Sequence, residues 1–244
     1  MARILLVDDE SLFAKATRLL LEQEFGHDVD TAQSVSEVLQ LGGRSYDVAL
    51  VDMILHRDRP GTGTQGSLSD GNGLDVLAHL SQAPHPPLFV LLTAGDSPRQ
   101  HYMTTAFTNF PIAGALPKSA DPATLKECLD AVLAGSEYIH PEIAPYRPAE
   151  DGDPSEQLLA SDLDRAIWFA LANGRTSHQA IAEHANYSRH TIENAIASIG
   201  SKLHRLGLSP KQSPKLADLI VYAAQHRDYF LWASRAEAHT GHDA

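Results

Sequence analysis

The sequence predicts a doubly wound α/β domain with a five-stranded parallel sheet, followed by an all-α domain. Three observations predict this fold class. Short apolar runs alternate with helix-like stretches through the first 137 residues, residues 158–236 show helical periodicity alone, and the two regions differ in charge. A chain of 244 residues is long enough for two domains of ordinary size.

The first region alternates between two kinds of segment. Five short runs rich in β-branched residues or leucine are the expected strands: Ile4–Val7, Asp28–Ala32, Val48–Val51, Leu88–Leu92 and Gly114–Leu116. Stretches with apolar residues three and four apart are the expected helices: Leu12–Phe25, Val35–Leu41, Leu74–Leu80, Tyr102–Phe107 and Leu125–Leu133. This alternation predicts a flavodoxin-like parallel sheet with helices on both faces, and ligands of such sheets bind beyond the carboxyl ends of the strands.

The charge distribution supports a boundary between two domains. Residues 1–140 carry nine basic and 18 acidic residues, whereas residues 158–244 carry nine basic and eight acidic residues. The stretch between them is rich in proline and acidic residues and lacks periodicity, as is typical of a linker. We therefore expect domains at residues 1–137 and 158–236, joined by a linker at 138–157.

Composition excludes several classes of protein. A hydrophobic content of 43% excludes a fully disordered chain, and the net charge of −12 argues against a wholly basic nucleic-acid coat protein. The chain has no run of 18 apolar residues and turns acidic after seven residues, so we expect neither a membrane span nor a secretory signal. Cys128 is the one cysteine, which excludes an internal disulfide and fits a reducing cytoplasm.

Side chains suited to phosphate chemistry stand at the ends of four expected strands. In chain order they are Asp8 and Asp9, Asp52, Thr93, and Lys118. Three carboxylates at one edge repel one another unless a cation joins them, and an oxygen-only cluster suits Mg²⁺. A hydroxyl and an ammonium group opposite them would hold phosphoryl oxygens, so the pattern favours attack of an aspartate on phosphate with metal assistance. The alternative is that each residue separately caps a helix or solubilises a loop.

The chain resembles the receiver domains of response regulators over about residues 1–135, through the segments ILLVDDES, VALVDM, LLTAGDS and ALPKSA. The resemblance implies Asp52 as the phosphoacceptor, and Asp8, Asp9, Asp52 and the backbone carbonyl of Ile54 as the Mg²⁺ site. It also implies that Thr93 is the switch hydroxyl, that Lys118 contacts the phosphate, and that a sensor histidine kinase is the phosphate donor. The stretch DAVLAGSEYIHPEIA further resembles the last receiver helix and linker of the NarL/FixJ subfamily.

Two features depart from the receiver pattern. Ala115 stands three positions before Lys118, where these receivers usually carry an aromatic switch residue, so the usual coupling through a rotating ring cannot operate. A glycine-rich insertion over residues 56–72 follows Asp52 where the family usually has a short loop. The insertion, which contains Arg57 and Arg59, could gate the site or could be a passive surface loop.

The second region predicts a helix-turn-helix. A first apolar helix covers Asp164–Ala172, a second begins at Ser177, and a turn leads to a third that Ser188 can cap. The third helix carries an apolar stripe three and four residues apart, at Ile192, Ile196, Ile199 and Leu203. Two helices joined by a short turn, the second with polar residues outward, are the arrangement that places a recognition helix in the major groove.

This region resembles the LuxR-type output domain over about residues 158–208. The resemblance implies that promoter DNA is a partner and that the exposed positions of the third helix face it: Ser188, Arg189, His190, Thr191, Asn194, Ser198 and Lys202. Glu193 and Ala195 stand where the family usually has lysine and histidine, so binding by a monomer is expected to be weak. A bundle used for protein contact alone is the alternative.

The C-terminal segment is expected to form one further helix, which either docks on the bundle or forms a homodimer interface, and residues 237–244 a disordered tail. The whole chain is thus identified as a two-component response regulator that binds DNA and catalyses only its own phosphotransfer and dephosphorylation. Two alternatives are a phosphorylation-independent regulator that acts by protein contact and a stand-alone phosphatase with an aspartate nucleophile. The segment after Asp52 lacks the second aspartate that such phosphatases use as an acid.

Overall fold

The computed structural model describes residues 1–55, 71–94, 100–148 and 154–240, with the backbone alone for 154–155 and 235–240. Contacts divide the chain into two compact units, Met1–Pro148 and Ala149–Ala244. Among the described helices, none has both the length and the apolar character needed to cross a bilayer.

The first unit is a parallel sheet with the strand order β2-β1-β3-β4-β5-β6. Its strands are β1 (Arg3–Val7), β2 (Asp28–Ala32), β3 (Val48–Asp52), β4 (Leu88–Thr93), β5 (Ile112–Pro117) and β6 (Tyr138–Ile139). The first five strands confirm the predicted doubly wound sheet, because β1 pairs in parallel with both β2 and β3 and the order then runs outward to β5.

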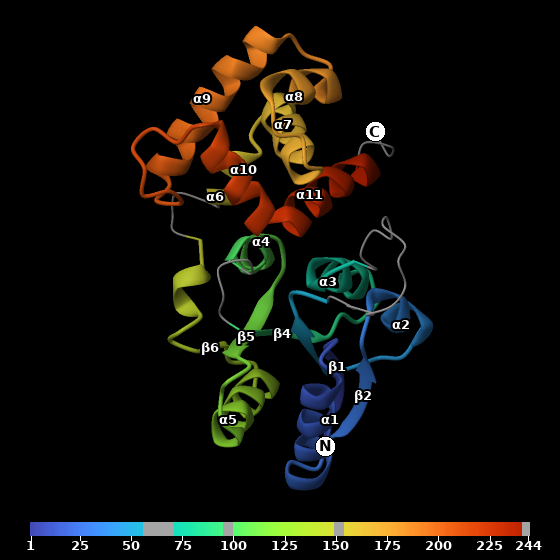
Figure 1. The fold of residues 1–244 in the computed structure, drawn as a ribbon. Helices are drawn as coiled ribbons and strands as arrows, with labels where there is room; N and C mark the ends of the chain where they lie inside the picture. Colours follow the sequence, from blue (N-terminus) through green and yellow to red (C-terminus); the bar gives the residue numbers. More distant parts are fainter. Residues whose placement is uncertain (56–70, 95–99, 149–153, 241–244) are drawn as a thin grey trace. The chain divides into compact units, whose positions relative to one another are not determined.

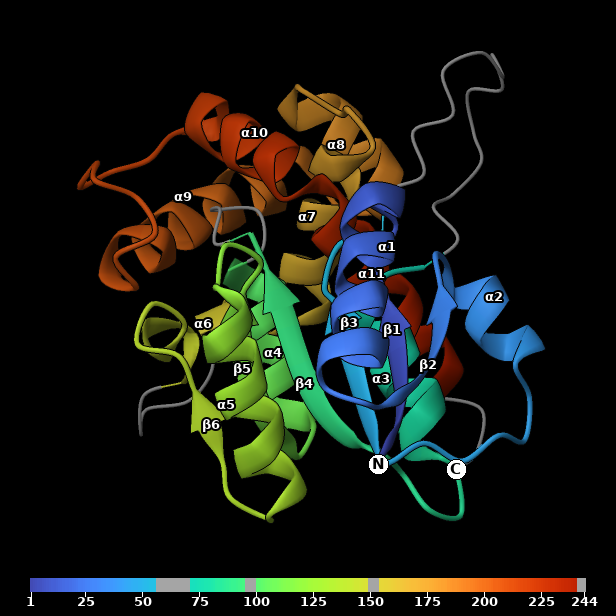
Figure 2. The same ribbon diagram turned by 90° about the horizontal axis from the view of Figure 1, so that it is seen from below.

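Helices cover both faces of this sheet. They are α1 (Ser11–Leu19), continued by the π-helix η1 (Leu20–Glu24), α2 (Val35–Gln40), α3 (Gly73–Ser81), α4 (Gln100–Asn109) and α5 (Pro122–Leu133). Three of them begin at side-chain caps, since Ser34, Asn72 and Asp121 each accept a hydrogen bond from a backbone N–H of the first turn. Figures 1 and 2 show α1 and α5 on one face and α2, α3 and α4 on the other.

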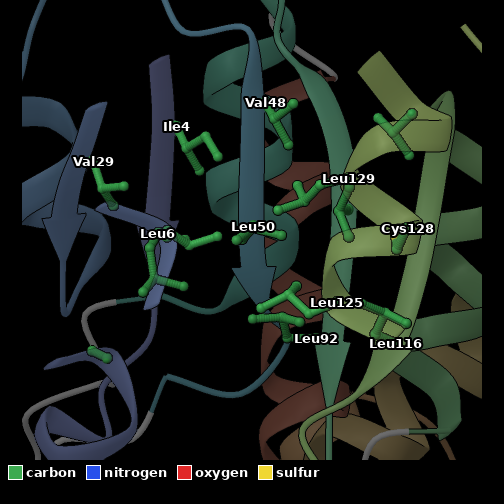
Figure 3. Packing of buried hydrophobic residues seen from close by; sticks show 14 residues of the cluster. Ile4, Leu6, Val29, Val48, Leu50, Leu92, Leu116, Leu125, Cys128 and Leu129 are labelled. Carbon is green, nitrogen blue, oxygen red and sulfur yellow. The ribbon is translucent and has the colours of Figure 1, made fainter. Parts of the chain in front are cut away.

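The core under α1 and α5 is made by alternate residues of the strands. Ile4 and Leu6 of β1, Val48 and Leu50 of β3, and Val90 and Leu92 of β4 point to this face and are buried. Leu125, Cys128 and Leu129 of α5 pack on them, as Figure 3 shows. Cys128 is therefore a core residue, and its burial raises the pKa of its thiol to about 12.

The sixth strand corrects the prediction of a five-stranded sheet. Tyr138 and Ile139, expected in the linker, pair in parallel with Gly114 and Ala115 of β5, and the amide of His140 donates to the Ala115 carbonyl at 2.9 Å. The 3₁₀ helix η3 (Ala144–Tyr146) follows and packs against α4. The first unit therefore extends past residue 137, because the chain after α5 returns to the free edge of β5.

The second unit contains helices only among its described residues. They are α6 (Pro154–Leu158), α7 (Asp162–Ala172), α8 (His178–Ala185), α9 (Arg189–Arg205), α10 (Leu216–Gln225) and α11 (Arg227–Thr240). Its core forms around Trp168 of α7, which is fully buried, stacks on Phe230 at 4.5 Å between ring centroids, and donates its indole N–H to the Leu158 carbonyl.

The C-terminal region differs from the prediction in two ways. The single expected helix is broken at His226 into α10 and α11, and both helices pack against α7. The tail predicted to be disordered from residue 237 is helical through Thr240, since α11 ends there, and residues 241–244 lie outside the described chain.

Candidate functional site

The predicted phosphate-site residues lie at one edge of the sheet. Asp8 follows β1, Asp52 ends β3, Thr93 ends β4 and Lys118 follows β5. These four strands are neighbours and run parallel, so their carboxyl ends meet at the same edge. Residues separated by more than 100 positions in sequence thus come together, as Lys118 and Glu10 show with a 3.1 Å contact.

Lys118 is the centre of this edge. Its Nζ lies 2.8 Å from Oδ2 of Asp8, 2.8 Å from Oδ2 of Asp52 and 3.1 Å from Oε1 of Glu10. The side chains of Asp8 and Asp52 are buried and that of Lys118 is 8% exposed, whereas that of Glu10 is 60% exposed. The ammonium also lies 5.1 Å from the ring centroid of Phe13. The site is therefore a buried ion-pair cluster with one acidic side chain at its rim.

The pKa values show that this cluster is short of positive charge. Burial, followed by the nearby charge of Asp52, raises the pKa of Asp8 to about 6, although a hydrogen bond from Lys118 acts in the opposite direction. Burial would lower the pKa of Lys118, but the charges of Asp52 and Asp8 outweigh it and hold that pKa above its ordinary value. Lys118 is thus a firmly charged ammonium, and one cation faces several carboxylates.

The carboxylates are arranged to accept a further cation. One carboxylate oxygen from each of Asp8, Asp9 and Asp52 lies within 4.8 Å of the others. Oxygen donors of this kind suit Mg²⁺, which binds through one or two carboxylates together with carbonyl and water oxygens. The backbone amide of Ile54 lies 3.3 Å from Oδ1 of Asp52 and donates to it. The role of the Ile54 carbonyl as a ligand stays a prediction.

The predicted switch hydroxyl, Thr93, and the residue at the usual aromatic switch position, Ala115, lie in neighbouring strands of the sheet. Thr93 is buried at the end of β4, and its carbonyl accepts a hydrogen bond from the amide of Lys118 at 2.7 Å. Ala115 is buried in β5, between Leu91 of β4 and Ile139 of β6. The insertion lies outside the described residues from 56 to 70, and with it Arg57 and Arg59.

Helices α8 and α9 form the predicted helix-turn-helix. Ser177 caps α8, Asn186 ends it in the left-handed conformation with φ of 57°, and the Ser188 hydroxyl caps α9 by accepting from the amide of Thr191. The predicted stripe on α9, Ile192, Ile196, Ile199 and Leu203, is buried. These local signals fix which side of α9 faces outward.

Five of the seven predicted DNA-facing residues are exposed on α9 or its cap: Ser188, Arg189, His190, Asn194 and Ser198. Thr191 is half-buried. Nε of Arg189 donates to Oε1 of Glu193 at 2.8 Å, and the side chains of Asn194 and His190 contact at 3.2 Å. The face is thus polar, with one arginine paired to an acid on the same helix.

Lys202, also predicted to face DNA, is paired within the second unit. Its Nζ donates to Oδ2 of Asp164 in α7 at 2.7 Å, and the two side chains are 21% and 8% exposed. Lys202 therefore joins α9 to the buried first helix. Sequence reasoning missed this partner, although an acid within the apolar face of the Asp164–Ala172 helix signalled that a buried carboxylate needs a cation. Sequence reasoning also did not identify Glu10 as a contact of Lys118. His204 and Arg205 are further basic residues in the last turn of α9 that are exposed and were not among the predicted site residues.

Comparison with known proteins places both units in one architecture. No protein-family model matches the chain. The nitrate/nitrite response regulator protein NarP of Escherichia coli (strain K12) is 27% identical over 209 residues, covering 83% of this chain and 88% of NarP. A solved structure of two RcsB dimers bound to two parallel DNAs has a TM-score of 0.55 at 18% identity, and a second RcsB–DNA complex has 0.54 at 17%. Each covers 92% of this chain and 98% of the RcsB chain.

The RcsB structures share the fold over nearly the whole length, and NarP shares sequence across both units. The carboxyl ends of β1, β3, β4 and β5 carry, in chain order, the acidic, hydroxyl and lysine side chains expected of a receiver. Helices α8 and α9 form the helix-turn-helix. In sequence and in fold, the chain is therefore similar to response regulators that join a receiver domain to a helix-turn-helix domain.

Proposed function

We propose that this chain is phosphorylated on Asp52 by a sensor histidine kinase and regulates transcription by binding promoter DNA through α9. The observation that carries the proposal is the pair of 2.8 Å contacts from Lys118 to Asp8 and Asp52 at the edge of the sheet. A buried lysine between two buried carboxylates holds Asp52 in place beside a positive charge, which suits a nucleophilic carboxylate.

The transfer follows from these contacts. An Oδ atom of Asp52 attacks the phosphorus of the donor while the bond from phosphorus to the donor histidine nitrogen breaks, and the released imidazole takes a proton from water. Mg²⁺, held by Asp8, Asp9 and Asp52, would supply neutralisation of the phosphoryl charge. Lys118 loses one carboxylate partner when Asp52 becomes an acyl phosphate, so its ammonium is available to a phosphoryl oxygen. The Thr93 hydroxyl, at the end of the adjacent strand, would donate a hydrogen bond to a second phosphoryl oxygen.

The output step rests on α9. Its exposed residues include Arg189 and Asn194, an arginine suited to phosphate or guanine and an amide suited to a base edge. Glu193 competes with DNA for Arg189, because the two side chains are already paired at 2.8 Å. A recognition helix with a partly neutralised arginine needs a second copy for tight binding, so we propose that the phosphorylated protein binds as a homodimer to two half-sites about one helical turn apart.

The proposal is tested by DNA selection with the full-length protein. Sequences selected from a random pool are used in salt-titrated gel shifts with the protein before and after treatment with acetyl phosphate and Mg²⁺. We expect tighter binding after treatment, loss of that gain in Asp52→Asn, and a lower salt dependence in Arg189→Ala. Asn194→Ala should relax preference at one base position.

A variant at Glu193 sharpens the same test. Glu193→Gln keeps the shape of the side chain and removes its charge, which frees Arg189 for phosphate, so binding should strengthen at low salt. Absence of any sequence-specific shift in either phosphorylation state would contradict the proposal and favour a regulator that acts by protein contact.

A further inference from the structure

Glu10 is the acidic residue of the cluster that no predicted role includes. It occupies the N-cap position of α1, but its side chain makes no capping hydrogen bond. Its backbone is fixed at the site, since its amide donates to Oδ1 of Asp8 at 2.9 Å and its carbonyl accepts from Ala14 at 2.9 Å. The carboxylate instead reaches Nζ of Lys118.

We infer that Glu10 is a positioning residue that slows phosphorylation of Asp52 by occupying one donor of Lys118 and repelling the anionic phosphate donor. The inference rests on the proposed function, because it concerns the same site. It adds an electrostatic control at the rim that sets how readily the site accepts phosphate from different donors.

The number of hydrogen-bond donors on the Lys118 ammonium group supports this role. A lysine has three N–H donors, and Lys118 has three carboxylate partners: Asp8, Asp52 and Glu10. Before Asp52 is phosphorylated, an oxygen of the incoming phosphoryl group can reach Lys118 only if one of these partners moves away. Asp8 and Asp52 are buried and held, whereas Glu10 is 60% exposed and can turn into water at little cost.

The charge of Glu10 acts in the same direction. Two groups that bind one ammonium lie about 6 Å apart, so the Glu10 carboxylate and an incoming phosphoryl group repel each other at short range. In largely solvated surroundings this repulsion slows the reaction about three- to tenfold, and salt weakens it. The chemical step is unchanged: an Asp52 oxygen–phosphorus bond forms as the donor's own bond to phosphorus breaks and its leaving group departs.

The test compares two small donors at low and high salt. Acetyl phosphate is a dianion and phosphoramidate a monoanion near neutral pH, and the full-length protein with Mg²⁺ is labelled by each and followed by intact mass. Glu10→Gln preserves the size and an acceptor oxygen while it removes the charge. We expect its rate with acetyl phosphate to rise about three- to tenfold, the rise with phosphoramidate to be smaller, and both to shrink at high salt.

Two further variants make the result specific. Glu24→Gln removes an equal charge from an exposed residue of η1. Glu24 lies near the opposite, amino end of the sheet, since Asp28, four residues later, pairs with Arg3 at the start of β1. Its rates should match those of the wild type. Glu10→Asp restores the charge and should return the rate toward that of the wild type, whereas a purely structural contact would not depend on donor charge.

Several outcomes overturn the inference. Equal rates for Glu10→Gln and wild type, equal gains with both donors, or the same gain in Glu24→Gln would each show that Glu10 does not act as inferred. Failure of the wild type to label with either donor would contradict the proposed function itself and remove the basis of the inference. Labelling of the wild type with an unaltered Glu10→Gln rate refutes the Glu10 role alone.

Discussion

Replacement of Lys202 by methionine should destabilise the second unit strongly. Lys202 donates to Asp164 at 2.7 Å, and the Asp164 side chain is 8% exposed. Methionine keeps the apolar stem of lysine but leaves the carboxylate without its cation in a dry environment. A change at an exposed position of α9 would have no such effect on folding.

The magnitude follows from the burial of the pair. Removing one partner of a fully buried ion pair costs about 3–5 kcal/mol, and the 21% exposure of Lys202 reduces this to about 2 kcal/mol. For a domain of about 100 residues, that loss lowers the midpoint of thermal unfolding by about 8–16 °C. Asp164→Asn in the Lys202→Met background should recover part of the loss, because the uncompensated charge is gone.

Tryptophan fluorescence reports this unit selectively. Both tryptophans of the chain, Trp168 and Trp232, lie in the second unit, so their emission during urea unfolding follows that unit alone. Lys211→Met is the matched control, since Lys211 pairs with Asp218 at the surface with 64% of its side chain exposed. Its effect should stay within about 0.5 kcal/mol.

Measurement of DNA binding by Lys202→Met shows whether Lys202 supports the fold or contacts DNA. Lys202→Met should leave the salt dependence of DNA binding unchanged when measured well below its unfolding midpoint. Wild-type stability together with a salt slope reduced by about one unit would show that Lys202 contacts phosphate instead of supporting the fold.

Two further predictions concern packing and pH. Gly73→Ala should slow phosphorylation of Asp52 and cost about 2 kcal/mol, because a Cβ at residue 73 would lie 2.5 Å from the Asp52 carbonyl oxygen and 2.7 Å from Cα of Met53. Gly42→Ala, whose Cβ would meet its nearest atom at 3.5 Å, is the control in phosphorylation assays and in urea unfolding followed by circular dichroism, and equal behaviour of the two variants would refute this steric argument. Burial lowers the pKa of His226 to about 4, below its ordinary value of 6.5, so its contribution to stability is complete above pH 6.5 and is lost as the pH falls toward 4, by about 3 kcal/mol at most. Urea unfolding at several pH values should show this loss in the wild type and a smaller one in His226→Phe, and identical pH profiles would contradict the assignment.

Local signals predicted much of this structure. The strand Asp28–Ala32 matches its expected bounds, and the helix His178–Ala185 begins directly after its expected start at Ser177, because turn residues and capping side chains flank these elements. The gathering of Asp8, Asp52, Thr93 and Lys118 also followed from sequence alone, since parallel strands bring their carboxyl ends together whatever the loops between them.

Features that depend on distant partners could not be predicted. The two residues of β6 are too few to show a strand period, and they pair only because the edge of β5 is free. Lys202 occupies an outward position in the helical pattern, yet its flexible side chain reaches Asp164, 38 residues away. The break between α10 and α11 at His226 falls in a polar stretch, residues 225–228, that contains neither glycine nor proline, so tertiary packing on α7 decides it.

The proposed function depends on whether the acidic edge of the sheet accepts phosphate on Asp52. Intact mass spectrometry of the full-length protein after incubation with acetyl phosphate and Mg²⁺, followed by peptide mapping, tests it most directly. We expect the addition of a single phosphoryl group at Asp52, abolished by a chelator and in Asp52→Asn. Equal labelling of wild type and Asp52→Asn, or labelling that ignores the chelator, would contradict it.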